Sequence, residues 1–175
     1  MSNELILLLL TVLPPILILL FVIKSDRFPE PTITLIITFI LGAASTEIAG
    51  YLNSMFPFQL KETAISFASA GFTEEPLKFL ILYLFILKKK EFDEPMDGIV
   101  YATCISLGFA TVENLNYVYF TYGDESLSTA LIRSLTAIPL HASCGIIMGF
   151  YFGLHVFKKI PNYLYYSLLI PIAIH

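Results

Sequence analysis

Apolar residues gather in six long blocks along the chain, each bounded by charged residues or by proline and asparagine. The apolar layer of a bilayer is about 30 Å thick and needs roughly 20 apolar residues per helical span. The blocks run from Leu5 to Ile23, Thr32 to Leu52, about Glu62 to Leu87, about Gly98 to Phe120, about Leu127 to Phe157, and Tyr163 to His175. They predict an all-α, polytopic transmembrane bundle of about six helices.

The sixth block has about 13 residues, or 20 Å of helix, and is too short to cross a bilayer. We therefore expect this helix to be incomplete and the natural chain to continue beyond His175. The sequence shows no internal repeat, no low-complexity tract and no long linker, so residues 1–175 are predicted to form a single membrane-embedded domain.

The composition agrees with lipid as the solvent. The mean hydropathy is +0.78, and 57% of residues are hydrophobic while 14% are charged, which is more apolar surface than one water-soluble core can hide. The net charge of -4 is spread over short loops, without a basic stripe interleaved with aromatic residues. A nucleic-acid partner is therefore excluded, and the lipid bilayer is the expected surrounding.

Lysine and arginine in the loops predict the orientation. They follow the first, third and fifth helices, at Lys24 and Arg27, at 88–90, and at 158–159. The other loops offer Lys61 next to an acid, and the acidic pair 124–125. Because loops rich in Lys and Arg stay in the cytoplasm, we expect the N-terminus to lie outside.

Ionisable side chains lie inside the predicted spans, where each costs roughly 2.5–3.5 kcal/mol on insertion. At a rise of 1.5 Å per residue, those of four helices fall in one layer that extends from the bilayer midplane outward. The set consists of Glu74, Glu75, Glu113, His141 and His175, and the same helices also carry the polar residues Lys78, Asn114 and Arg133. Their common depth predicts a functional site.

Lys78 lies four residues after Glu74 and three after Glu75. Residues three and four apart share a helix face, whereas the two adjacent glutamates cannot point the same way. We therefore expect Lys78 to neutralise one carboxylate while the other turns to the bundle centre. Pro76 removes a backbone hydrogen bond and is expected to kink this helix at the glutamates.

The sequence also predicts where two helices approach closely and where the fourth helix begins. Gly145, Gly149 and Gly153 follow one another at intervals of four on the face that carries His141, so another helix is expected to approach closely there. Asp97 precedes a glycine at the start of the fourth block and is predicted to be the N-cap of that helix.

The ordered motifs resemble the PrsW family of intramembrane proteases, which is similar in turn to the CAAX prenyl endopeptidases. The resemblance covers roughly residues 70 to 175 and is carried by the following segments: Glu74-Glu75-Pro-Leu-Lys78, Asp97-Gly98, Gly108-Phe109-Ala110-Thr-Val-Glu113-Asn114, Arg133 with His141, and His175. It departs from the family pattern where Pro76 stands within the Glu-Glu motif and where the chain stops at His175.

The resemblance implies cleavage of a single-pass, membrane-anchored protein near the extracytoplasmic side, with anti-sigma factors as the known substrate class. It also implies a multi-pass protein of the bacterial cytoplasmic membrane. We interpret Glu75 as the general base that activates water, with Glu74 nearby, and His141 and His175 as groups that position the water or stabilise the oxyanion. Glu113, Asn114 and Lys78 would form the supporting shell.

Arg133 is expected to pair with an acid or to reach toward the outer surface. A metal-free site is slightly favoured, because the ammonium of Lys78 within one turn of both motif glutamates would repel a cation. Zinc held by His141, His175, Glu75 and Glu113 is the alternative cofactor, since two histidines with carboxylates form a common catalytic zinc set.

Two further interpretations stay open. A buried chain of Glu, Lys and His is also typical of proton relays and small proton-coupled transporters, although the chain lacks the paired repeats of such proteins. His141 and Cys144 are three residues apart and could form a thiolate dyad, but a cysteine in an apolar helix stays a thiol.

Overall fold

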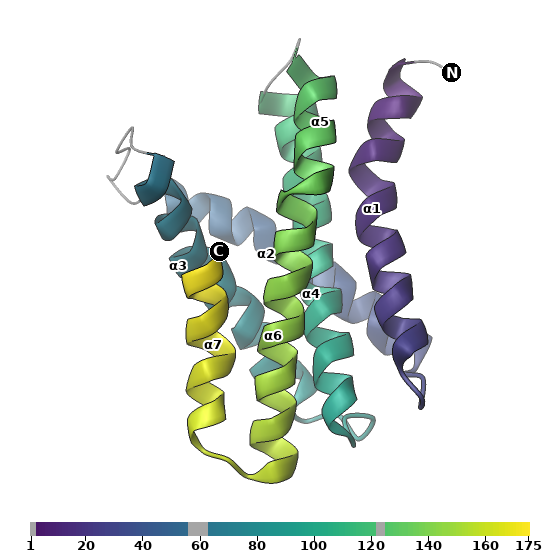
Figure 1. Ribbon diagram of the computed structural model, residues 1–175, viewed down its shortest axis with the longest axis vertical. Coiled ribbons are helices and arrows are strands. Elements are labelled where there is room, and N and C mark those ends of the chain that lie inside the picture. Colours follow the sequence, from purple (N-terminus) through teal and green to yellow (C-terminus); the bar gives the residue numbers. More distant parts are fainter. Residues whose placement is uncertain (1–2, 56–62, 122–124) are drawn as a thin grey trace.

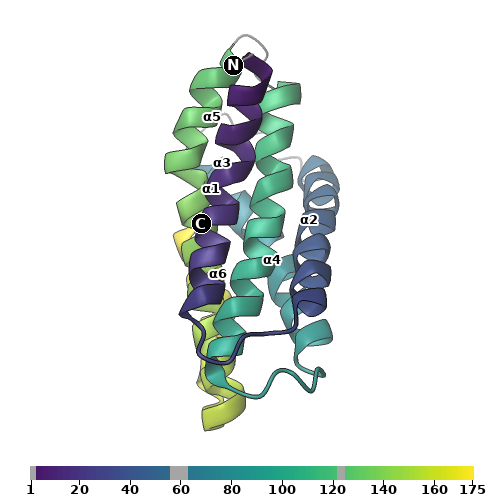
Figure 2. The ribbon, with the colours of Figure 1, turned by 90° about the vertical axis from the view of Figure 1, so that its right-hand side faces the viewer.

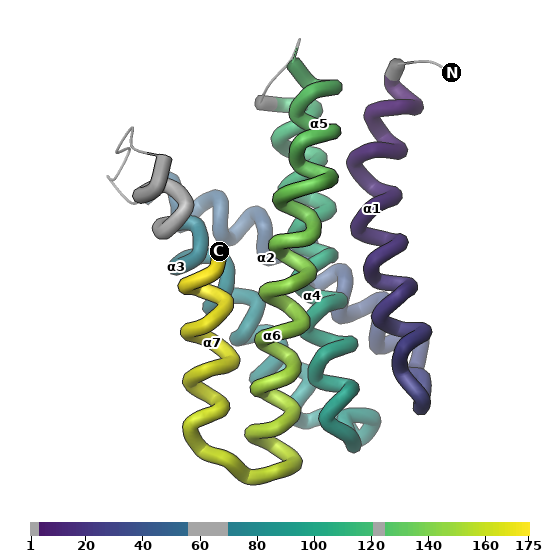
Figure 3. Tube along the Cα trace, in the orientation of Figure 1, coloured from purple at the N-terminus to yellow at the C-terminus, as the bar shows by residue number. Residues whose placement is uncertain are grey.

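The structure, a computed structural model, describes residues 3–55, 63–121 and 125–175, and these residues form helices without a strand. The elements are α1 (Asn3–Ser25), α2 (Thr32–Met55), α3 (Thr63–Ile81), the π-helical turn η1 (Leu82–Ile86), α4 (Pro95–Asn116), the π-helical turn η2 (Tyr117–Thr121), α5 (Ser126–Leu135), α6 (Ala137–Lys158) and α7 (Asn162–Ile174). Figures 1 and 3 show them as a bundle of upright rods crossed by the more tilted α2 and α3.

The predicted fold class is confirmed. Each of the six predicted helices is present within a few residues of its expected bounds, with η1 continuing α3, η2 continuing α4, and α5 with α6 making the fifth helix. The expected start of the third helix at Glu62, and the loop residues Lys61 and Asp124, lie outside the described residues.

Four helices in the described part of the chain are long and apolar enough to cross a membrane: Glu4–Ser25, Thr32–Met55, Pro95–Phe120 and Ser126–Lys158. Large apolar side chains such as Leu17, Phe21 and Ile33 are exposed on α1 and α2. They would face lipid, since lipid tails solvate leucine and isoleucine as well as a protein core does.

The fifth helix is interrupted at Thr136, whose φ and ψ of -120° and -68° separate α5 from α6. Pro139 is the third residue of α6, a position where the missing backbone N–H is tolerated because the first turn has no intrahelical partner for it. The amide of Leu140 still donates to the carbonyl of Thr136 at 3.0 Å, so the two halves stay nearly continuous.

Helix α4 is the centre of the bundle. It packs against α6, α2 and α1, and most of its length is buried, including the large side chains of Tyr101 and Phe109. Figure 2 shows α4 between the α1/α6 side and α2. Residues on several faces of α4 can therefore reach different neighbours at the same depth.

Glycines bring α4 and α6 close together, as the spacing of Gly145, Gly149 and Gly153 predicts. A methyl group built on Gly98 of α4 would lie 2.6 Å from the carbonyl oxygen of Gly149, and one built on Gly153 would lie 2.5 Å from the carbonyl oxygen of Pro95. No real Cβ tolerates these distances without a shift of the backbone. The small residues thus set the separation of the two helices.

The predicted cap of the fourth helix is wrong in position. Helix α4 begins at Pro95 with Glu94 as its N-cap, and Asp97 is its third residue. The Oδ2 atom of Asp97 accepts the backbone N–H groups of Asp93 and Glu94, at 2.8 and 2.7 Å. Asp97 acts from inside the first turn because proline at the first helical position lets the helix begin three residues earlier than expected.

Candidate active site

The site begins on α3, where Glu74, Glu75 and Lys78 are all buried. The ammonium Nζ of Lys78 lies 2.7 Å from Oε1 of Glu75 and 3.5 Å from Oε2 of Glu74. Lys78 therefore contacts both carboxylates, where one partner was expected. The shorter contact is with Glu75, and the Oε2 atom of Glu75 is buried without a hydrogen-bond partner among the described residues. A charged oxygen is thus left free at the bundle centre.

His141 of α6 links this group to α4. Its Nδ1 lies 3.1 Å from Nζ of Lys78, and its Nε2 lies 3.0 Å from Oε2 of Glu113. Lys78 also lies over the ring of Phe109, 4.2 Å from its centroid, and that ring contacts the imidazole of His141 at 5.7 Å. Both nitrogens of His141 are therefore engaged, and its orientation is held from α3 and α4.

Arg133 of α5 holds Glu113 from the other side. Its Nη2 donates to Oε2 of Glu113 at 2.6 Å, while its Nε donates to Oδ1 of Asn114 at 2.5 Å. The guanidinium carbon also lies 4.0 Å from the ring centroid of Tyr117. The expected pairing of Arg133 with an acid is present, and that acid is Glu113.

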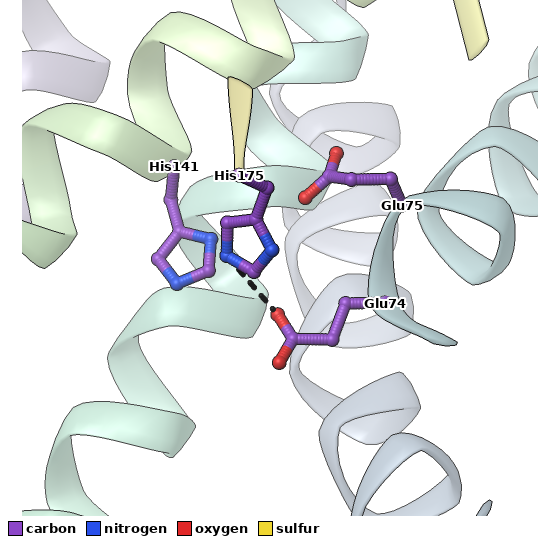
Figure 4. A group of neighbouring side chains, drawn as sticks. All are labelled: Glu74, Glu75, His141 and His175. Atoms are coloured by element: carbon purple, nitrogen blue, oxygen red, sulfur yellow. Dashed lines mark ion pairs between the residues drawn. The ribbon is translucent and has the colours of Figure 1, made fainter. Parts of the chain in front are cut away.

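His175, the C-cap of α7, completes the group, with Nε2 3.6 Å from Oε2 of Glu74 and its ring centroid 4.9 Å from that of His141. Gly71 makes this approach possible, because a methyl group there would lie 2.8 Å from the carbonyl oxygen of Ile172 and 3.3 Å from Cβ of His175. The last turn of α7 can therefore rest directly on α3. Figure 4 shows His175 facing Glu74, with His141 and Glu75 beside it.

Four side chains from three helices converge at one point. One potential ligand atom from each of Glu74, Glu75, His141 and His175 lies within 4.8 Å of the others. A cluster of carboxylates and imidazoles buried among membrane helices has the groups that activate water: a proton acceptor, and donors for a developing oxyanion.

A family model described as "PrsW family intramembrane metalloprotease" matches residues 30–175. The chain belongs to the PrsW family. Membership makes it a multi-pass membrane peptidase and therefore a hydrolase, and it favours hydrolysis over the transport interpretation.

Several curated PrsW relatives are similar over most of the chain. Protease PrsW of Clostridioides difficile (strain 630) is 38% identical over 173 residues, which cover 92% of this chain and 73% of the relative. Protease PrsW of Geobacillus kaustophilus (strain HTA426) is 35% identical over 160 residues, covering 89% and 69%. Protease PrsW of Bacillus subtilis (strain 168) is 41% identical over 114 residues, covering 63% and 50%. No solved structure matches the chain.

The PrsW description as a metalloprotease raises the question whether these residues fit a metal. Two imidazoles and two carboxylates are the donor types of catalytic zinc, and Oε2 of Glu75 and Nδ1 of His175 are buried without partners. With all three carboxyls ionised, Glu74, Glu75 and Glu113 would carry one more charge than Lys78 and Arg133 offset. The residues therefore fit a divalent cation in both donor type and charge.

The four clustered side chains differ from the predicted metal ligands in one residue. Glu113 was expected among the ligands, but it lies at Nε2 of His141 and is held by Arg133, while Glu74 occupies the cluster with Glu75 and both histidines. Glu113 is thus placed to orient His141, as a carboxylate behind a metal-binding histidine commonly does.

The remaining residues singled out from the sequence lie around the cluster. Asn114 is buried, and its Oδ1 accepts from Arg133, while its Nδ2 has no hydrogen-bond partner among the residues that the structure describes. Cys144 points toward α7, where its thiol lies 3.8 Å from the carbonyl oxygen of Pro171. The aromatic partners Phe109 and Tyr117 were not singled out as contacts, although Phe109 stands four residues before Glu113 on the same helix face.

Proposed function

We propose that this PrsW-family chain is an endopeptidase that hydrolyses a peptide bond of a membrane-anchored protein inside or next to the bilayer. The observation that carries the proposal is the buried convergence of Glu74, Glu75, His141 and His175. Side chains of this kind are costly in membrane helices, and they gather here at one point rather than along a path. Side chains that meet at one point can act together on one water molecule, whereas a proton path would need groups spread along the helices.

We propose Glu75 as the general base, because Lys78 holds its Oε1 ionised while Oε2 is free to accept a proton. Water bound near Oε2 would lose a proton to Glu75 as its oxygen bonds to the scissile carbonyl carbon. The same proton would then pass to the leaving amine as the carbon–nitrogen bond breaks. The products are a new carboxylate and a new amine.

Glu74, His141 and His175 are the proposed metal ligands, which would make a His₂Glu set. A zinc-type ion bound there would polarise the carbonyl and the attacking water. Glu113 and Arg133 hold the imidazole of His141 in place through Nε2, which leaves Nδ1 to face the cluster. The family description and the excess of carboxyl groups over cationic side chains favour this alternative over the metal-free site expected from the sequence.

The proposed substrate is a single-pass protein of the bacterial cytoplasmic membrane, cut near its extracytoplasmic side, with anti-sigma factors as the class that the family resemblance implies. The large apolar exposure of α1 and α2 supports access from lipid, since a substrate helix would approach through the bilayer. The loops bearing lysine and arginine gather at the lower end of the bundle in Figure 1, opposite the end at which α5 begins. This arrangement supports the predicted orientation.

Purified protein in nanodiscs, mixed with a candidate single-pass substrate, tests the proposal. Glu75→Gln and His141→Ala should lower the cleavage rate by about 100-fold or more while the protein still accumulates. Cys144→Ser is the matched control and should stay within a few-fold of wild type. Full activity of Glu75→Gln would remove the proposed base.

Metal dependence is measured on the same preparation. We expect about one equivalent of zinc, activity lost with a strong chelator and restored with zinc, and loss of bound zinc in His175→Ala. Cleavage that persists in a metal-free sample would restore the metal-free Glu/His mechanism.

A further inference from the structure

A second group of carboxylates lies at the opposite end of α4 from Glu113. One oxygen from each of Asp26, Glu30 and Asp97 lies within 4.8 Å of the others. Asp26 and Glu30 belong to the segment between α1 and α2, and Asp97 belongs to the first turn of α4. At 1.5 Å per residue, Asp97 lies roughly 24 Å from Glu113 along α4, so this group is separate from the proposed active site.

Each carboxylate has one oxygen already fixed by a donor from the protein. Oδ1 of Asp26 accepts the backbone N–H of Phe28 at 3.0 Å, and Oδ2 of Asp97 accepts two backbone N–H groups. The hydroxyl of Tyr101 donates to Oε2 of Glu30. These contacts orient the side chains, in the way that outer-shell partners orient the ligands of a metal.

The second oxygens of the two aspartates are buried and have no partner. Within the described part of the chain, Oδ2 of Asp26 and Oδ1 of Asp97 make no hydrogen bond, although the two residues are only 7% and 0% exposed. Among the described residues, no lysine, arginine or histidine forms an ion pair with any of the three carboxylates. A buried charge without a partner costs several kcal/mol, so a missing positive charge is indicated at this point.

We propose that Asp26, Glu30 and Asp97 bind a hard divalent cation of the Mg²⁺ or Ca²⁺ class, which fastens the α1–α2 connection to the start of α4. The donors are all oxygens, and such ligands select Mg²⁺ and Ca²⁺ over zinc, which prefers nitrogen and sulfur. Three carboxylates leave further coordination positions for water, as both ions commonly require.

The position of this cation site gives it a mechanical role. Helix α4 carries Glu113 and Phe109 of the proposed active site and is the helix on which α1, α2 and α6 pack. A cation at its first turn would hold the α1–α2 connection against it, and α1 ends beside that turn at the lower end of the bundle (Figure 2). Bound cation is therefore expected to stabilise the whole bundle rather than to take part in the cleavage step.

Terbium luminescence tests this site directly, because Tb³⁺ replaces Ca²⁺ at oxygen sites and is excited through nearby tyrosine. The chain has no tryptophan, and Tyr101 contacts Glu30. We expect saturable binding of about one Tb³⁺ per chain in EDTA-treated, detergent-solubilised protein, with displacement by Ca²⁺ or Mg²⁺. Tyr101→Phe should reduce the emission more than it reduces Ca²⁺ binding measured by calorimetry.

One double variant and two control variants distinguish this group from the other ionisable residues. The double variant Asp26→Asn/Glu30→Gln should weaken Ca²⁺ or Mg²⁺ binding at least tenfold and remove the rise in melting temperature that the cation produces. Asp93→Asn makes the same kind of charge change at an exposed position and should leave both unchanged. His175→Ala should also keep them, because it changes only the other cluster.

Three outcomes would overturn the proposal. The first is a lack of saturable cation binding in the wild-type protein. The second is binding that survives unchanged in the double variant. The third is a melting temperature that responds to pH but not to Ca²⁺ or Mg²⁺, which would mean that the carboxylates share a proton.

Discussion

The ammonium of Lys78 lies 3.1 Å from Nδ1 of His141, which joins α3 to α6 inside the bundle. Lysine has only donors, so Nδ1 accepts this hydrogen bond and the ring proton sits on Nε2, where it points to Glu113. His141 is therefore neutral and held in one tautomer. The same nitrogen that accepts from Lys78 is the one that faces the cluster, so Lys78 and a bound metal compete for it.

This competition predicts the behaviour of Lys78→Met. Without metal, the variant should unfold more easily by about 3–5 kcal/mol, because Glu75 stays buried after losing its partner. Added zinc should raise its melting temperature more than that of the wild type, since the ion can then replace the missing positive charge. Lys90→Met, at an exposed position, is the control. An equal zinc effect in variant and wild type would argue against a metal in the cluster.

Arg133→Lys tests how Glu113 is held. Arginine contacts Glu113 and Asn114 through two different nitrogens, whereas a lysine can keep only the charge. We expect the cleavage rate to fall by about tenfold, which corresponds to about 1.4 kcal/mol of activation free energy. Arg133→Met should reduce it further, because Glu113 then loses its cation. If both variants cleave equally well, the orientation of His141 does not depend on Arg133.

Gly149→Ala should disrupt the packing of α4 on α6. A methyl group at this position would lie 2.5 Å from the carbonyl carbon of Gly98 and 2.6 Å from Cα of Ile99, and both are backbone atoms that cannot rotate away. We expect a loss of about 1–3 kcal/mol of stability, measured by thermal unfolding in detergent. Gly50→Ala is the matched control, because nothing lies within 4 Å of a methyl group there.

The stability of the cation-free protein should depend on the pH through Glu30. Burial and the negative charges of Asp97 and Asp26 raise the pKa of Glu30 from 4.5 to about 7 in the folded protein. Because the folded pKa is above the unfolded one, this contribution is fully present below pH 4.5 and is lost as the pH rises through about 7. In EDTA, the melting temperature should therefore fall between about pH 5 and pH 8.

Glu30→Gln should flatten this pH dependence, because the amide does not titrate, and Asp93→Asn should retain it. A wild-type melting temperature that rises over the same interval would contradict the direction of the shift.

The orientation of the bundle can be tested with single cysteines in a background that lacks Cys104 and Cys144. A thiol at Lys89 should be protected from an impermeant reagent added to intact cells and should react after the membrane is opened. A thiol at Asn3 should react from outside. The reverse pattern would place the lysine-rich loops outside and would move the proposed cleavage to the cytoplasmic side.

Much of this protein follows from its sequence alone. An apolar block of about 20 residues can satisfy its backbone in lipid only as a helix, so the six blocks became six helices with nearly the expected ends. Helical rise predicted a similar depth for Glu74, Glu75, Glu113, His141 and His175. Helical spacing predicted that Lys78 reaches a glutamate of α3, although one contact was expected and the structure has two. These relationships depend on local geometry, which the order of residues determines.

Relationships between helices required the tertiary structure. Depth along a helix says nothing about its rotation, and the rotation decided that Glu113 meets Nε2 of His141 while Glu74 joins the cluster. The course of the α1–α2 connection brought Asp26 and Glu30 to Asp97, although 71 residues separate Asp26 from Asp97 in the chain. Packing between helices sets these features, because the separation and rotation of two helices depend on both surfaces at once. The clearest example is the close backbone contact of Gly98 with Gly149.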